Sequence, residues 1–89
     1  MAELIHQFHD PVRSRDGVPF VAQAWAESNR RWHGWLVFIA ADGRILRTAQ
    51  ETSRPSRDDV RAWAARLRPR ALAAALARAV PPSAQLPAA

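Results

Sequence analysis

The chain of 89 residues has no cysteine, no lysine and only three glycines, each isolated from the others. The absence of cysteine excludes disulfide bonds and thiolate nucleophiles. Isolated glycines exclude a glycine-rich phosphate loop, and no serine lies in a Gly-x-Ser-x-Gly elbow. We therefore expect a protein that is not an enzyme, needs no cofactor and has no small-molecule substrate.

The N-terminus has no long apolar run. Its first ten residues, MAELIHQFHD, place Glu3 and His6 around only two aliphatic residues. A signal peptide would show a basic segment followed by an apolar one, and a membrane span would be apolar throughout. We expect a cytoplasmic protein that does not enter a membrane.

Positive charge is present only as arginine, and it is unevenly distributed. Thirteen arginines against eight acids give a net charge of +5. Residues 1–50 hold six arginines and five acids (+1), whereas residues 51–89 hold seven and three (+4). Arginine and the nineteen alanines both use GC-rich codons, so genome composition is one explanation of the excess and a phosphate-facing surface is the other.

Four segments predict β-strands. Residues 4–8, 18–28 and 31–41 are rich in apolar residues at alternating positions, and a fourth strand follows the Asp42-Gly43 dipeptide. If these two residues form a type I′ hairpin loop, Ala41 faces Arg44 and the pairing continues along both strands. The predicted pairs are Ile39 with Leu46, Val37 with Thr48, Leu36 with Ala49 and Trp35 with Gln50.

Two helices are predicted after the strands. Ser56 is the expected N-cap of the first, and Asp58 and Asp59 add negative charge in its first turn. Its apolar stripe is Val60, Trp63, Ala64 and Leu67. Pro69 ends this helix after a bend at Arg68 and begins the second, residues 69–80, which places Leu72, Leu76 and Val80 on one face.

The order of four strands and then two helices predicts an α+β fold, in which an antiparallel four-stranded meander carries both helices on one face. We expect a single domain over residues 1–80. Pro81-Pro82 stops the second helix, and the segment after it has little apolar content, so residues 81–89 are expected to form a mobile tail.

Several short patterns occur in a fixed order along this chain: a W-x-GWL-x-F strand, a DG turn, an RT-x-x-ET segment and P-x-R followed by WA-x-x-L. The matching residues are Trp32, Gly34, Trp35, Leu36, Phe38, Asp42, Gly43, Arg47, Thr48, Glu51, Thr52, Pro55, Arg57, Val60, Trp63, Ala64 and Leu67. In these residues the chain resembles a group of small uncharacterised bacterial proteins, over about residues 8–80. The resemblance implies the domain boundaries and no activity.

Histidines do not indicate a metal site. His6 and His9 are three residues apart, so on a regular strand they point to opposite faces. A site would also need His33 to come close to them, because a metal ion takes at least three protein ligands. We expect surface or interface histidines and no bound metal.

The strand RWHGWLVF predicts an interaction surface, because both of its faces are apolar. Trp32, Gly34, Leu36 and Phe38 line one face, and His33, Trp35, Val37 and Ile39 line the other. Two helices cannot cover both faces. Either a curled sheet or the N-terminal segment shelters the second face, or that face binds a second copy or another protein through Trp25, His33, Trp35 and Val37.

The arginines of the C-terminal part predict a second candidate surface. Arg57, Arg61 and Arg68 fall along one edge of the first helix at 3.6 residues per turn, with Arg54 and Ser56 near its start. That edge could follow a phosphate backbone, although no aromatic residue alternates with these arginines as in a base-stacking platform. The first hypothesis is a self-associating protein-interaction module, and the alternative is a nucleic-acid-binding accessory protein.

Overall fold

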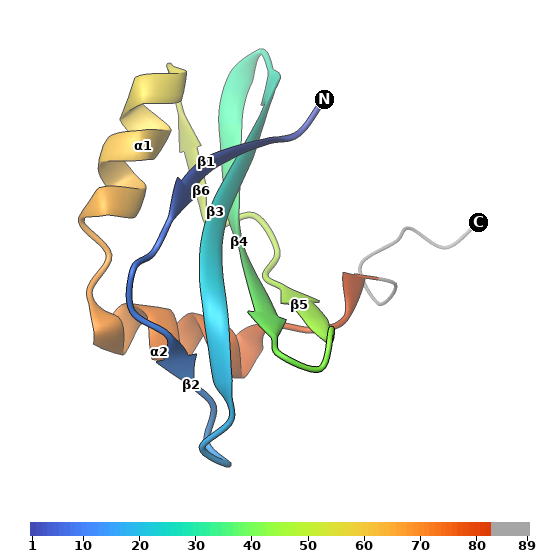
Figure 1. The fold of residues 1–89 in the computed structure, drawn as a ribbon. Coiled ribbons are helices and arrows are strands. Elements are labelled where there is room, and N and C mark those ends of the chain that lie inside the picture. The colour runs from blue at the N-terminus through green and yellow to red at the C-terminus, as the bar shows by residue number, and fades with distance from the viewer. Residues whose placement is uncertain (83–89) are drawn as a thin grey trace.

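The computed structural model describes residues 1–82 and shows an antiparallel sheet followed by two helices, which confirms the predicted α+β class (Figure 1). The strands are β1 (Glu3–Gln7), β2 (Val12–Arg13), β3 (Pro19–Asn29), β4 (Arg31–Ala40), β5 (Ile45–Arg47) and β6 (Thr52–Arg54). The helices are α1 (Arg57–Ala65) and α2 (Pro69–Arg78). The tail was predicted over residues 81–89, of which residues 83–89 lie outside the described residues.

The centre of the sheet is the long hairpin of β3 and β4. These strands pair along their whole length, from Phe20 opposite Ala40 to Asn29 opposite Arg31. β1 and β2 pair with the outer edge of β3, and β5 and β6 pair with the outer edge of β4. The sheet is therefore four strands wide, and each of its edges is built from two short strands.

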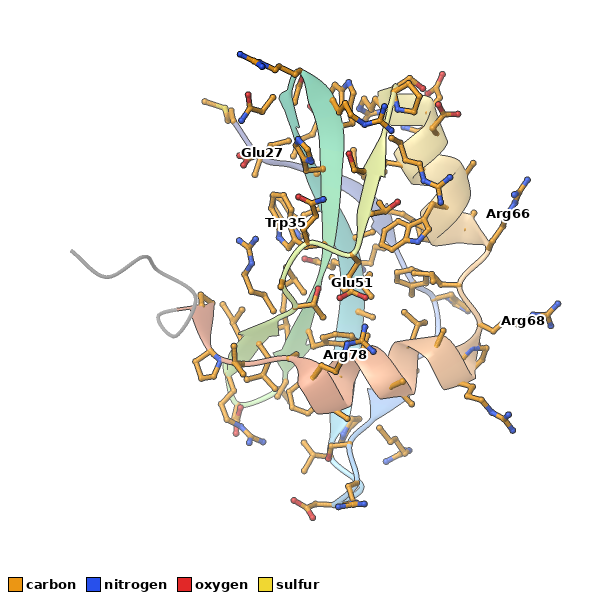
Figure 2. All side chains as sticks on the ribbon, turned by 180° about the vertical axis from the view of Figure 1, so that it is seen from behind. Glu27, Trp35, Glu51, Arg66, Arg68 and Arg78 are labelled. Carbon is orange, nitrogen blue, oxygen red and sulfur yellow. The ribbon has the colours of Figure 1, made fainter. Side chains whose placement is uncertain are left out.

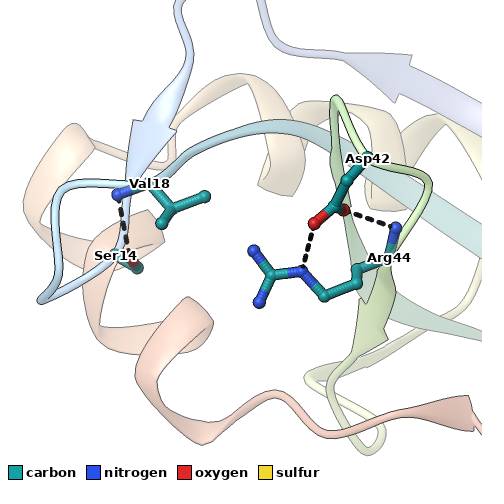
Figure 3. Close-up of polar contacts among 4 residues, drawn as sticks. All are labelled: Ser14, Val18, Asp42 and Arg44. Carbon is teal, nitrogen blue, oxygen red and sulfur yellow. Dashed lines mark hydrogen bonds and ion pairs between the residues drawn. The ribbon is translucent and has the colours of Figure 1, made fainter.

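The hairpin between β4 and β5 differs from the predicted one by a single residue. Ile39 pairs with Ile45 and Phe38 with Leu46, so the predicted pairing of Ile39 with Leu46 is wrong. The loop has three residues, Ala41 to Gly43, because Gly43 has a φ of +91° and Ala40 hydrogen-bonds to Arg44. A left-handed glycine that ends a three-residue loop is the alternative to the two-residue type I′ turn. In the same loop, the Asp42 carboxylate accepts hydrogen bonds from the backbone and the side chain of Arg44 (Figure 3).

The predicted fourth strand is interrupted at Thr48. The Thr48 backbone N–H donates to the Leu36 carbonyl, and its hydroxyl accepts from the Leu36 N–H at 3.0 Å. This buried side chain thus takes the place of the next backbone carbonyl in the ladder. The predicted pairs of Val37 with Thr48, Leu36 with Ala49 and Trp35 with Gln50 do not form, because the one-residue shift pairs Val37 with Arg47 and the chain then leaves the ladder after Thr48. Pairing resumes in β6.

Both helices begin where the sequence predicts. The Ser56 hydroxyl accepts from the Asp59 N–H at the start of α1, and Pro69 occupies the first turn of α2. Val80 does not lie on α2, because the helix ends at Arg78 and the chain turns to form an antiparallel bridge between Val80 and Arg47. Val80 is consequently exposed and covers the free edge of β5.

The core lies between the helices and one face of the sheet. Alternate residues of β3 and β4 point toward the helices, and the alanines at positions 22, 24 and 26 of β3 lie next to the larger Leu36 and Phe38 of β4. The buried set is Phe20, Ala22, Ala24, Ala26, Leu36 and Phe38 from the sheet with Val60, Ala64, Leu72 and Leu76 from the helices. The alanines of β3 give the helices a close approach to the sheet, and the molecule is a slab with principal extents of 38 × 36 × 18 Å.

Candidate functional site

The face of the sheet opposite the helices, which we call the open face, is not covered by any described element. Directly opposed residues of paired strands share a face, so the strand register assigns its residues in rows. The rows are Val21, Ile39 and Ile45; Gln7, Gln23, Val37 and Arg47; Leu4, Trp25 and Trp35; and Glu27, His33 and Ser53.

The open face is more apolar than a solvated sheet face requires. Antiparallel sheets commonly place polar residues on the side that faces water. Eight alternate residues of β3 and β4, from Val21 to Glu27 and from His33 to Ile39, lie on the open face. Five of these eight are apolar, namely Val21, Trp25, Trp35, Val37 and Ile39. Leu4, Val21 and Ile45 are each more than 40% exposed. The helices therefore leave an apolar surface open on the other side of the sheet.

The predicted interface residues Trp25, His33, Trp35 and Val37 all lie on this face, and they are not equally accessible. Trp35 is only 7% exposed, because Trp25 is directly opposite it and the guanidinium of Arg47 lies 4.3 Å from its ring centre (Figure 2). The Trp25 indole N–H donates to Gln23. The aromatic pair thus forms the rigid centre of the open face, and the aliphatic residues around it are more exposed.

His33 lies at the polar end of the open face, between Glu27 and Ser53. Its Nε2 lies 3.1 Å from the Asn29 carbonyl, so Nε2 carries the proton that is donated there. Nδ1 is buried without a partner, the only such side-chain nitrogen or oxygen in the described residues. His33 therefore packs with one ring nitrogen bonded and the other enclosed, and no group of three or more side chains that could hold a metal ion occurs in residues 1–82.

The fold keeps only part of the predicted arginine edge, because Arg57 and Arg61 lie about one turn apart on α1 and Arg68 lies outside it. Arg57 pairs with the Glu3 carboxylate, and Arg61 is exposed on α1. Arg68 does not extend that edge, because it has extended dihedrals as the N-cap of α2 (φ −90°, ψ 160°). The cause is Pro69, since the residue before a proline avoids helical dihedrals. Ser56 is used as the N-cap, and Arg54 ends β6.

The structure instead brings two arginines to an aromatic side chain that the sequence did not connect with them. A hollow of about 260 Å³ is lined by Arg54, Asp59, Ala62, Trp63, Arg66 and Leu67. Arg54 comes from β6, and the other five come from α1 and the bend after it. The three-residue spacing of Trp63 and Arg66 on a helix could have indicated this pair from the sequence. The position of Arg54 in the hollow depends on the pairing of β6 with β4.

The arginines of this hollow lie on the helical side of the slab, away from the open face. Figure 2 shows Arg66 and Arg68 pointing into solvent beside the helices, while Trp35 lies on the other side of the sheet. Residues 54–70 hold six arginines and two aspartates, which is +4 of the net +5. The molecule thus has an apolar side and a charged side.

Comparison with known proteins identifies no relative. No family model matches the chain, and no curated protein or solved structure matches it either. The resemblance to small bacterial proteins therefore stays a prediction. No helix in residues 1–82 is long and apolar enough to cross a membrane.

Proposed function

We propose that this protein is a non-enzymatic interaction module that self-associates through the open face. The observation that carries the proposal is the arrangement of side chains in rows on that face. The apolar rows that contain Val21 and Trp25 lie on either side of the row that contains Gln23, and no described element covers them. Trp25 and Trp35 at its centre are of the residue type most enriched at interface hot spots. Trp35 lies directly opposite Trp25 and against the Arg47 guanidinium, which holds it in place before binding.

A second copy is the partner that the charges and shape of the open face favour. Glu27 and Arg47 give this face a charge of each sign, with Arg31 in the row next to Glu27, although the rest of the molecule is basic. In a two-fold symmetric interface each copy presents the same patch, so an acid and a cation on that patch can pair across the axis.

A shallow apolar hollow on the same face supports self-association further. Its volume is about 230 Å³, and Val21, Ile39 and two prolines are among its lining residues, all of which are apolar. Ile45, 46% exposed in the same row, is a side chain of the size that such a hollow accepts. A protruding residue and a hollow on one face are the elements of a self-complementary contact.

The size of the slab is compatible with a stable dimer. A specific interface buries about 800 Å² per partner, and the two long dimensions of the molecule are 38 and 36 Å. Stacking two sheets face to face would produce a four-layer particle with helices on both outer sides.

Sedimentation equilibrium at micromolar concentrations tests the proposal. We expect a dimer for the unmodified chain and a monomer for Val21→Lys, because the lysine places a charge in the apolar row without disturbing a buried position. Ala74→Lys adds the same charge to the exposed side of α2 and should remain dimeric. A monomeric unmodified chain, or equal dissociation of both variants, would contradict the proposal. Trp35→Ala is a poorer test, since loss of this buried side chain would also weaken the sheet.

A further inference from the structure

We propose that the hollow between Arg54, Trp63 and Arg66 binds a nucleotide, with its phosphate on the two guanidinium groups and its base against the apolar wall. This site is distinct from the open face and does not depend on self-association. The nucleotide could be free or one unit of a single-stranded nucleic acid, and the experiment below separates these two sources.

Unpaired positive charge is the first observation behind the proposal. Arg13, Arg31, Arg44, Arg57 and Arg78 hydrogen-bond to a carbonyl, a hydroxyl or an acid elsewhere in the described residues. Arg66 forms no ion pair or hydrogen bond there through its side chain, and the Arg54 Nε donates only to the neutral Thr52 hydroxyl at 2.8 Å. Asp59 lines the same hollow but pairs with neither arginine. Both guanidinium groups therefore have donors free for an anion.

The indole of Trp63 supplies a further donor. No hydrogen bond within residues 1–82 uses the Trp63 N–H, and this nitrogen is not among the buried atoms without a partner. It therefore reaches solvent, while the far end of the ring packs in the core, 3.5 Å from where a Cβ on Gly34 would lie. One indole N–H and two guanidinium groups line this hollow as three donors, and Asp59, which pairs with neither arginine, is the acidic residue beside them.

The apolar part of the hollow favours a nucleotide over a simple anion. Ala62, Trp63 and Leu67 form a wall beside the two arginines. Bases stack on aromatic and apolar side chains with little sequence preference, at about 1–3 kcal/mol per base for aromatic contacts. The concentration of charge in residues 54–70 extends the basic surface beyond the hollow, so a strand could continue past Arg68 and Arg70.

Binding should be measured by fluorescence anisotropy with a labelled oligothymidylate of about twelve nucleotides at low salt, a length within the usual range of single-strand sites. Arg66→Gln should weaken binding about tenfold, the value of a charge-assisted hydrogen bond. Arg61→Gln removes the same charge from an α1 residue that does not line the hollow. Because no hydrogen bond to the phosphate is lost, it should weaken binding less than about twofold. Equal losses of affinity in both variants would show only a general attraction to a basic surface and would contradict the proposed site.

Three further variants sharpen the assignment. Trp63→Phe keeps an aromatic ring, although a smaller one, and removes the N–H, and should weaken binding. Asp59→Asn should strengthen binding, because it removes a negative charge from the hollow, whereas Asp58→Asn, one residue away on α1 and outside the lining, should have a smaller effect. Weaker binding by Asp59→Asn would contradict a phosphate in this hollow.

Competition separates the two sources of the nucleotide. If uridine monophosphate displaces the labelled strand at micromolar concentration and inorganic phosphate does not, the site takes free nucleotides. If neither competes but an unlabelled oligonucleotide does, the ligand is a single strand. If inorganic phosphate competes as well as the mononucleotide, the base contributes nothing, and the nucleotide assignment is wrong.

Discussion

At the scale of single residues, Gly34 controls how closely α1 approaches the sheet. A Cβ at this position would lie 3.0 Å from the Thr52 Cγ2 and 3.1 Å from the Val60 Cγ1. Real Cβ atoms are seldom so close to their neighbours, so an alanine would push the helix or the side chains outward. Gly34 is therefore needed for packing, and its backbone dihedrals require no glycine, since its φ is not positive.

We expect Gly34→Ala to lower the free energy of unfolding by about 1–3 kcal/mol, the usual cost of overpacking a core. Urea denaturation measures the effect. The control is the same substitution in a Val60→Ala background, where the removed methyl groups make room and the cost should shrink. An undiminished cost in that background would show that the penalty does not come from the contact with Val60.

At the scale of elements, the β4–β5 hairpin shows what the sequence could and could not predict. The Asp-Gly dipeptide correctly placed the turn, because few residues adopt the required dihedrals. It did not fix the register, since a left-handed Gly43 fits a three-residue loop as well as a two-residue one, and the difference shifts every pair by one residue. The Ser56 cap and the α1 stripe were predictable because both depend on residues within two turns.

The sequence also did not predict which face of β4 lies in the core, and the reason is different. Trp32 and Leu36 on one face are as apolar as Trp35 and Val37 on the other, so periodicity gives no preference. The small alanines of β3 decide it, because only they permit the helices to pack closely. Similarly, the hollow at Trp63 needs Arg54 from β6, and the sequence predicts no strand over residues 52–54.

The β4–β5 hairpin gives a prediction about the pH dependence of stability. Asp42 has a pKa below its ordinary value of 3.8, first because its carboxylate accepts the Arg44 backbone N–H, and also because the Arg44 guanidinium lies beside it. A depressed pKa means that the carboxylate stabilises the folded hairpin at pH values above 3.8, and that this contribution is lost as the pH falls through the lower folded value. We expect Arg44→Ala to leave part of the depression of the pKa in place, because the backbone hydrogen bond remains, as measured by NMR titration of the Asp42 carboxyl carbon. A return of the pKa to its ordinary value would show that the guanidinium is the main cause.

At the scale of the whole molecule, the slab separates its two proposed activities onto opposite sides. The open face carries apolar rows with one acid, and the helical side carries +4 in residues 54–70. If two copies stack through their open faces, their basic sides point outward and lie apart by more than the Debye length of about 10 Å at 0.1 M salt. A dimer would then present two nucleotide-binding hollows that face in opposite directions.

This arrangement predicts that salt affects the two activities differently. Raising sodium chloride from about 50 to about 200 mM should change the dimer dissociation constant by less than about threefold, because repulsion between distant charges is already screened. Oligonucleotide binding should weaken with a slope near −0.7 per contacted phosphate in log–log form, and Arg66→Gln should reduce that slope by about one contact. Sedimentation and anisotropy in the same salt series measure both. A dimer that dissociates as steeply as the oligonucleotide would show that charged contacts, and not the apolar rows of the open face, hold the two copies together, which would contradict the proposed apolar interface.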